Sequence, residues 1–424
     1  MRKWMPLLAS VGGVAVLALV VAGLGPATAG PTLSDEETLG KAIFFDERLS
    51  INQNQSCASC HDPAVGWTGP TEAINIRGSV YEGSIPDAFG DRKPPASAYA
   101  TQAPILHMPE PGFFVGGTFW DGRATGERLG SPTAEQALGP FLNPVEQALP
   151  DAACVVYGVV NGGYPVSFQE VWGNAIDAVT WPLDVQTTCA TPGSVVALSE
   201  GDRALVAVAY DQIGLSIAAY EASLESNAFT SKFDARKAGL AKFTNLEQKG
   251  FALFKGKGKC DLCHIAKGTM PLFTDYTYDN LGLPSNPENP ANIADPSFVD
   301  LGLGKFLETR AEYAQYAEDN YGKFKVPTLR NVDLRPDAGF VKAFGHNGYF
   351  KSLRAIVHFY NTRDVLSTCD PAEHPGWVEG EDCWPEPEYP ENVNDAELGD
   401  LKLTQRQEAA IVAFLRTLSD GYLP

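Results

Sequence analysis

Positive charge is scarce in this sequence: 32 Lys and Arg stand against 52 Asp and Glu, a formal net charge of −20. This balance argues against a nucleic acid or an anionic membrane surface as the partner, because both would repel the chain. Methionine and histidine are also rare, with four and six copies in 424 residues, so each possible sulfur or imidazole ligand can be considered individually. Strand patterns are few as well, and we expect a mainly α protein of two or three domains.

No stretch after residue 29 is apolar enough to span a bilayer, whereas the first 29 residues have a different composition. Arg2 and Lys3 precede an uncharged, mostly apolar run over 7–24, and Ala27-Thr28-Ala29 provides the small residues of a cleavage site. This order is typical of a signal peptide over 1–29 that is cleaved near Ala29, although an uncleaved anchor would share the apolar run. We therefore expect a periplasmic protein, in a compartment where disulfides persist.

Four of the eight cysteines lie in two similar strings, Cys57-Ala58-Ser59-Cys60-His61 and Cys260-Asp261-Leu262-Cys263-His264. Two thiols at this spacing can each bond one vinyl group of a haem, and the following histidine then reaches the iron. A zinc site would normally add a second ligand pair, and a redox dithiol would not need the histidine. Each string therefore predicts one covalently bound haem c, with His61 and His264 as iron ligands.

The other four cysteines, Cys154, Cys189, Cys369 and Cys383, belong to no motif. In an oxidising compartment they would form two disulfides, for which three connectivities exist. We favour Cys154 with Cys189 and Cys369 with Cys383, because each of these pairs closes a local loop.

A repeated pattern precedes both haem strings. It reads Ser34-x-x-Glu37-x-x-Gly40-x-x-Ile43-Phe44 before the first and Thr244-x-x-Glu247-x-x-Gly250-x-x-Leu253-Phe254 before the second. The hydroxyl residue with glutamate three positions later is a capping box, which starts a helix. The glycine would permit close approach of another helix or of the haem, and the following apolar pair would cover the cofactor.

The repeat indicates two cytochrome-c-like haem domains, over 30–235 and 236–424. Further helices are expected at about 202–225 and 404–418, where apolar residues recur at helical spacing. The segments at about 150–200 and 365–395 lack useful periodicity. We expect them to be two disulfide-closed insertions in a fold with long loops, either functional surfaces or decoration.

Three segments carry a specific resemblance to a known family. They are Phe119-Trp120-Asp121-Gly122-Arg123, Glu135-Gln136-Ala137-Leu138-Gly139-Pro140 and Asn143-Pro144-Val145-Glu146. Together with Val326-Pro327-Thr328-Leu329-Arg330-Asn331, they resemble the bacterial di-haem cytochrome c peroxidases, including the methylamine-utilisation (MauG) branch. The resemblance covers most of the chain outside the two insertions.

The resemblance implies roles for individual residues. His61 would bind the iron of the peroxide-reacting haem, with Gln136 and Glu146 on its opposite side. Glu146 would be the acid–base group that moves a proton between the peroxide oxygens, although by itself it could be a surface acid. Trp120 would lie between the haems as an electron relay, a role compatible with ordinary core packing.

The second haem distinguishes the branches of the family. The resemblance places its second iron ligand, opposite His264, at Tyr360, where ordinary peroxidases of the family have methionine. The only methionine after His264 is Met270, which is too close in sequence to reach across the haem, and His358 is the rival ligand. A phenolate is hard and anionic and favours ferric and higher iron states, which indicates the MauG-like branch.

The first haem differs from the ordinary peroxidases too. They have a displaceable histidine ligand before the Arg-x-x-Pro segment, here Arg92-Lys93-Pro94-Pro95, and no histidine occurs between His61 and His107. We therefore expect an open first iron and regard His107 as a structural or pocket residue rather than a ligand.

Two further departures concern calcium and the partner. The family's inter-haem calcium uses an Asn where Lys93 stands and a Thr-x-Pro where Val341-Lys342-Ala343 stands, so calcium is possible but doubtful. The methylamine enzyme has a Trp at the position of Gly258, so the route to the partner must differ.

Six lysines in residues 240–267, among them Lys255, Lys257 and Lys259, give this segment a positive charge within an acidic chain. They could receive an acidic partner or serve the haem propionates. The favoured function is peroxide-driven oxidation of a side chain in a partner protein. The alternatives are a cytochrome c peroxidase, which reduces hydrogen peroxide with electrons from a small redox protein, and a non-enzymatic electron carrier.

Overall fold

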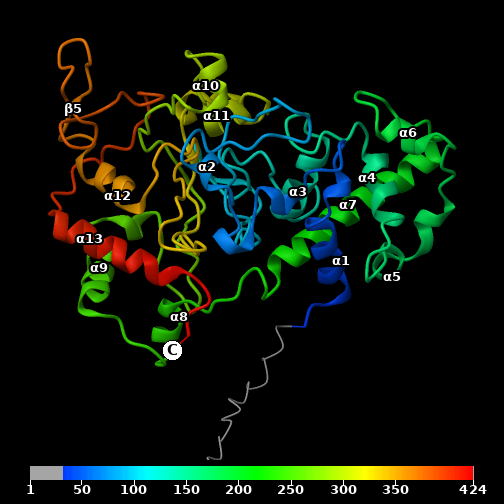
Figure 1. Cartoon of the computed structure of the whole chain (residues 1–424), viewed down its shortest axis with the longest axis horizontal. Coiled ribbons are helices and arrows are strands. Elements are labelled where there is room, and N and C mark those ends of the chain that lie inside the picture. Colours follow the sequence, from blue (N-terminus) through cyan, green and yellow to red (C-terminus); the bar gives the residue numbers. More distant parts are fainter. Residues whose placement is uncertain (1–31, 424) are drawn as a thin grey trace, which may run out of the picture. The chain divides into compact units, whose positions relative to one another are not determined.

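Helices are the main regular elements of residues 32–423, the part of the chain that the computed structural model describes (Figure 1). The helices are α1 (Asp35–Phe44), α2 (Glu72–Asn75), α3 (Pro132–Leu142), α4 (Ala152–Val160), α5 (Phe168–Trp172), α6 (Val185–Cys189), α7 (Glu200–Ala222), α8 (Lys232–Lys237), α9 (Asn245–Lys255), α10 (Pro290–Ala294), α11 (Gly302–Leu307), α12 (Leu353–Thr362) and α13 (Gln405–Leu415). The mainly α class is confirmed. The signal peptide expected over 1–29 lies outside the described residues.

The strands of the described chain are short and pair two by two. They are β1 (His107–Glu110) antiparallel to β2 (Phe113–Val115), β3 (Tyr278–Asp279) antiparallel to β4 (Phe324–Lys325), and β5 (Ser367–Thr368) parallel to β6 (Cys383–Trp384). Long ordered loops connect the elements. Among the described residues, no helix is both long and apolar enough to cross a bilayer.

Helices α1 and α7 pack closely on the right of Figure 1. The predicted capping box starts α1, because Ser34 accepts from the Glu37 backbone N–H while Glu37 accepts from that of Ser34. A Cβ atom on Gly40 would lie only 1.8 Å from the Ser216 carbonyl oxygen of α7. The glycine is thus required by contact between two helix backbones.

Helices α9 and α13 repeat this arrangement on the left of Figure 1. Thr244 and Glu247 form the second capping box. A Cβ atom on Gly250 would lie 1.8 Å from the Ala410 carbonyl oxygen of α13. The structure therefore confirms the repeat as two copies of one helix pair and shows that each glycine makes a helix contact.

Each helix pair contributes to its own cluster of buried apolar side chains, one drawn from residues 39–220 and the other from residues 233–418. A smaller third cluster joins Leu106 and Phe114 to Leu303 and Leu307. From Leu33 onward the chain nevertheless groups into one compact unit. The boundary near residue 235 therefore stays a prediction, supported by the two cores.

The two expected insertions differ in structure. Residues 150–200 contain α4, α5 and α6 and bury Val155 and Val156 in the first core, so this segment belongs to the core. Residues 365–395 carry β5 and β6 and are mostly exposed, although Trp384 reaches the second core. The predicted disulfides Cys154–Cys189 and Cys369–Cys383 are both present.

Candidate haem sites

The second haem string lies in the wall of a cavity that is larger than the cavities at the first string. We call it the second-motif cavity. It has a volume of about 220 Å³, and Cys260, Cys263 and His264 lie in its wall. Both thiols are free. The His264 Nδ1 atom lies 2.8 Å from the Phe273 carbonyl oxygen, to which it can donate. This contact leaves Nε2 available for a metal, as is usual for a ligating histidine.

Tyr360 lines the same cavity from α12. Burial is the main cause that raises the pKa of its phenol, and the Cys260 and Cys263 thiols and the Asp279 carboxyl add to it. The phenol takes part in no hydrogen bond within residues 32–423, so its oxygen is available for a ligand in the cavity. A bound cation would be needed to remove its proton, because burial favours the neutral form.

The two other histidines near this region are engaged elsewhere. His358 is directed away from the cavity, with Nδ1 2.9 Å from a Glu408 carboxylate oxygen and Nε2 2.9 Å from the Gly380 carbonyl oxygen. His346 lines the cavity, but its ring stacks on Phe324 and its Nε2 lies 3.0 Å from Glu388. Of the candidate ligands named from the sequence, the geometry therefore favours Tyr360 over His358.

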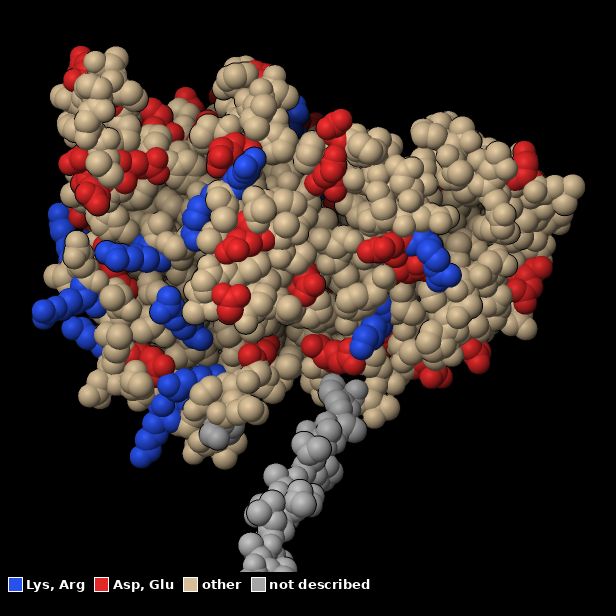
Figure 2. All heavy atoms as spheres, viewed as in Figure 1, with Lys and Arg blue, Asp and Glu red and all other residues tan. Residues whose placement is uncertain are grey.

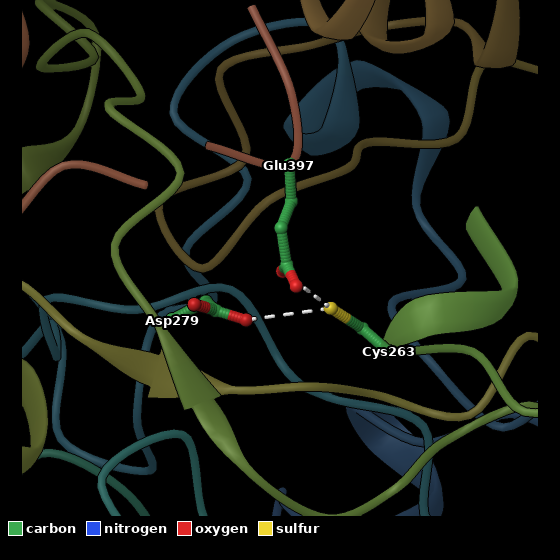
Figure 3. Close-up of side chains that lie close together, drawn as sticks. All are labelled: Cys263, Asp279 and Glu397. Atoms are coloured by element: carbon green, nitrogen blue, oxygen red, sulfur yellow. Dashed lines mark hydrogen bonds between the residues drawn. The ribbon is translucent and has the colours of Figure 1, made fainter. Parts of the chain in front are cut away.

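Two carboxylates that the sequence reasoning missed lie beside Cys263 (Figure 3). The Cys263 sulfur lies 3.5 Å from an Asp279 oxygen and 3.6 Å from a Glu397 oxygen. The Asn394 side-chain amide donates to both carboxylates, at 3.0 and 2.9 Å. Burial and the neighbouring Glu397 charge raise the pKa of Asp279. Because we expect Cys263 to attach the haem, we interpret Asp279 and Glu397 as acidic side chains beside the haem and not as metal ligands.

The first haem string lines two smaller adjoining cavities, of about 70 and 40 Å³, which we call the first-motif cavities. His61 lies in the wall of both, and Cys57 and Cys60 line the smaller one. The His61 Nδ1 atom lies 3.2 Å from the Trp67 carbonyl oxygen. The arrangement matches that of His264, with free thiols and one ring nitrogen directed to a backbone carbonyl.

Gln136 and Glu146 reach the first-motif cavities from α3 and from the turn that follows it. Gln136 lines both cavities, and Glu146 lines the smaller one. The Asn143 side-chain amide donates to Glu146 at 2.7 Å, and the Glu146 carbonyl accepts from Ser84 N–H at 2.7 Å. Burial raises the pKa of Glu146, although the hydrogen bond from Asn143 opposes this effect. A carboxyl with a raised pKa in a cofactor pocket suits proton transfer.

A further carboxylate, Glu221, was not foreseen. It lies on α7, is only 3% exposed, and lines both first-motif cavities. Burial raises its pKa to about 8. The signal was present in the sequence: Glu221 follows Ile217 by four residues and therefore lies on the buried face of the helix.

Trp120 lines both the second-motif cavity and the larger first-motif cavity. It is 9% exposed, and its indole N–H donates to the Lys93 carbonyl at 2.8 Å. Its location between the two haem strings agrees with the predicted one, and its function as a relay remains a prediction.

His107 lies on β1, is exposed, and has its Nδ1 2.8 Å from the Ile105 carbonyl oxygen. It is absent from the walls of the first-motif cavities, in which His61 is the sole histidine among the described residues. The structure thus favours the structural reading of His107 over that of a ligand.

Comparisons with known proteins agree with this geometry. The model of the family described as di-haem cytochrome c peroxidase matches residues 34–242. The methylamine utilization protein MauG of Paracoccus denitrificans is 33% identical over an alignment that covers 96% of this chain and 94% of that protein. This chain belongs to the di-haem cytochrome c peroxidase family.

Other members of the family show the same relationship. A cytochrome-c peroxidase of Denitromonas iodatirespirans is 27% identical, with 78% of this chain and 73% of that protein covered. The crystal structure of the diheme peroxidase BthA from Burkholderia thailandensis is 30% identical and has a TM-score of 0.69, covering 91% of this chain and 86% of that one. The di-haem peroxidase fold and a peroxidase-type oxidoreductase activity follow, and haem c is the implied cofactor. The residues fit it, because each string presents free thiols and a histidine to one cavity.

The surface of this di-haem peroxidase carries a basic region near the second haem string. Figure 2 shows Lys and Arg gathered at the lower left, around the place of α9. All six lysines of residues 240–267 are exposed. Lys257 donates to the Lys402 carbonyl and Lys259 to the Ala396 carbonyl, so these two also hold the loop before α13.

Proposed function

We propose that this di-haem peroxidase uses hydrogen peroxide to oxidise a side chain of a partner protein, as in the MauG-like branch. The observation that carries the proposal is the position of Tyr360 in the wall that also holds His264. A phenol oxygen at this position makes the second haem a poor collector of electrons and a good site for retaining an oxidation.

Bound at its two strings, haem c supplies the redox chemistry that splits peroxide and oxidises a second substrate. Cys57, Cys60 and His61 would hold the first haem, and Cys260, Cys263, His264 and Tyr360 the second. Asp279 and Glu397 place acid beside the second attachment site. Negative charge near a metal favours its more oxidised state, in agreement with the proposed role.

Proton transfer is assigned to Glu146. Its carboxyl can accept a proton from one peroxide oxygen and deliver it to the other, and its raised pKa brings it closer to neutral pH. The Asn143 amide holds one carboxylate oxygen, and Gln136 can donate a hydrogen bond to the substrate from α3. Trp120, in contact with the cavities of both strings, is placed to pass electrons between them.

The optical response to peroxide tests the proposal. The oxidised holoprotein should lack a methionine–iron charge-transfer band and should change its porphyrin absorption within milliseconds of mixing with peroxide, without prior reduction. Tyr360→Phe should change the resting spectrum and shorten the life of the oxidised product. Tyr349→Phe is the matched control, because Tyr349 bonds Glu379 and lies outside the second-motif cavity.

Two results would contradict the proposal. Identical spectra for Tyr360→Phe and the unaltered protein would exclude the phenol as a ligand. No response to peroxide would instead indicate an electron carrier with both irons saturated.

A cytochrome c peroxidase is the second candidate, and Gly258 is the observation that favours it. A Cβ atom at this position would lie 2.9 Å from the Leu253 carbonyl oxygen and 3.0 Å from the Ile411 side chain. The packing leaves no room for the Trp that the methylamine enzyme has here. If a reduced small redox protein accelerates peroxide consumption to multiple turnovers, this second function is the correct one.

The basic region is the proposed docking surface for an acidic partner. Lys249 and Lys255 are better probes than Lys257 and Lys259, because they donate no hydrogen bond to the described residues. The double change Lys249→Glu and Lys255→Glu should slow oxidation of an acidic cytochrome about tenfold or more at low salt. A basic cytochrome is the control, and an unchanged rate with the acidic one would exclude this surface.

A further inference from the structure

The ammonium group of Lys342 lies in a cage of backbone oxygens. Lys342 is only 4% exposed, and its Nζ donates to the carbonyl oxygens of Val65, Asn331 and Leu334, at 2.8, 3.1 and 2.9 Å. Three carbonyls around one buried cation resemble the oxygen sets that proteins offer to hard metal ions. Here the cation belongs to the chain itself.

A second buried lysine lies nearby. Lys93 is 8% exposed, and its Nζ donates to the Thr68 hydroxyl and the Pro94 carbonyl, both at 2.9 Å. Burial lowers the pKa of Lys342, and the charge of Lys93 adds to this effect. The three carbonyls oppose this effect, because they stabilise the protonated form.

Both lysines lie where the two haem sites meet. Each lines the second-motif cavity, while Val65 and Thr68 belong to the loop that follows His61. Gly66 keeps this loop near the cage: its φ is +74°, and a Cβ atom there would lie 2.7 Å from the Asn331 carbonyl oxygen and 3.1 Å from the Lys342 Nζ. The cage therefore ties the loop of the first haem to segments that line the second-motif cavity.

The donor set does not fit the calcium ion that the family resemblance suggests at this junction. Calcium takes six to eight oxygens, commonly including carboxylates. No carboxylate is a hydrogen-bond partner of either lysine in the described chain, and three of the available carbonyls are occupied by an ammonium. A divalent ion placed here would also be repelled by two lysines.

We propose that the Lys342 ammonium, with that of Lys93 beside it, is the resident cation of this junction and takes the place of a metal ion. The donor count distinguishes this role from binding of a haem propionate. An ammonium has three N–H donors, and Lys342 directs all three to backbone carbonyls. It has none left for a propionate.

The first test uses the unaltered holoprotein. We expect less than one tenth of an equivalent of calcium after gel filtration, and the same Tm and porphyrin spectrum with EGTA or with added calcium. About one equivalent of retained calcium, or a Tm that EGTA lowers, would overturn the proposal.

The second test empties the cage with Lys342→Ala. The variant should lose several degrees in Tm, and methylammonium should restore part of the loss in a saturable manner, because it can occupy the vacated position, whereas calcium should not. Lys351→Ala is the matched control, since Lys351 also donates to backbone carbonyls, those of Arg77 and Gly348, outside the second-motif cavity. An equal response to methylammonium in both variants, or rescue of Lys342→Ala by calcium, would overturn the proposal. If Lys342→Ala fails to fold, metal content and EGTA still decide the question.

Discussion

The regions around the two haem strings share the same helix packing but differ in the side chains that line their cavities. In both, a capped helix with a glycine at the same position packs against a partner helix, and a histidine directs Nδ1 to a backbone carbonyl. The opposing groups differ. The first region presents Gln136 and the carboxyls of Glu146 and Glu221, whereas the second presents the Tyr360 phenol together with the carboxyls beside Cys263.

This difference teaches that one scaffold can serve two tasks in the same molecule. Helix packing depends on the repeated residues, above all on the glycine at each helix contact. The other groups that line the cavities come from other segments, α3 and α7 in the first region and α12 in the second. They can therefore differ without altering the scaffold.

The largest expected effect sharpens the contrast between the two pockets. Glu146→Gln keeps the size of the side chain but removes its titratable proton. The reaction with peroxide should slow by about 10²–10⁴-fold, measured by stopped-flow absorption, while haem content stays the same. Glu225→Gln is the control, because Glu225 pairs with Lys41 outside both first-motif cavities. Equal rates for the two variants would remove Glu146 from the mechanism.

Substitutions at the two glycines test whether the two helix pairs are equivalent. Gly40→Ala and Gly250→Ala each place a Cβ atom 1.8 Å from a backbone oxygen, so the helices must separate. Each change should lower the free energy of unfolding by about 1–3 kcal/mol or more, measured by chemical denaturation. Gly376→Ala should have little effect, because its Cβ atom would meet nothing within 4 Å. A large loss at only one of the two helix contacts would show that the pairs are not equivalent.

The third expected effect concerns pH and the Glu221 carboxyl of the first region. The pKa of Glu221 is raised from 4.5 to about 8, so between these values the folded protein holds a proton that the unfolded chain has lost. This contribution to stability is complete below the lower value and declines as pH rises towards 8. Glu221→Gln should remove that decline, so the variant should gain stability over the unaltered protein as pH rises.

Thermal unfolding of the holoprotein at about pH 5 and about pH 9 measures this difference. Glu170→Gln, at an exposed capping position on α5, provides the comparison. If Glu221→Gln and the unaltered protein show the same pH dependence, Glu221 is ionised in the fold.

Much of the candidate site could be predicted from the sequence. The thiols and histidines of both strings, the capping boxes and both disulfides depend on residues near one another in the chain, so local spacing is sufficient. The positions of Tyr360, Gln136, Glu146 and Trp120 came from a resemblance to a family whose members keep these segments. Residues 150–200 were underestimated, because short helices such as α5 and α6 are too brief to show periodicity.

What the amino-acid sequence alone determined is the set of residues available: two strings of thiols and a histidine that suit haem c, a mainly α chain, and a tyrosine rather than a methionine at position 360. Only the tertiary structure decided which distant groups meet. Asp279 meets Glu397 beside Cys263, Glu221 enters the pocket of His61, and Lys342 occupies a cage drawn from residues 65, 331 and 334. The physical reason is that burial and carbonyl direction depend on packing between segments far apart in sequence, which no local pattern records.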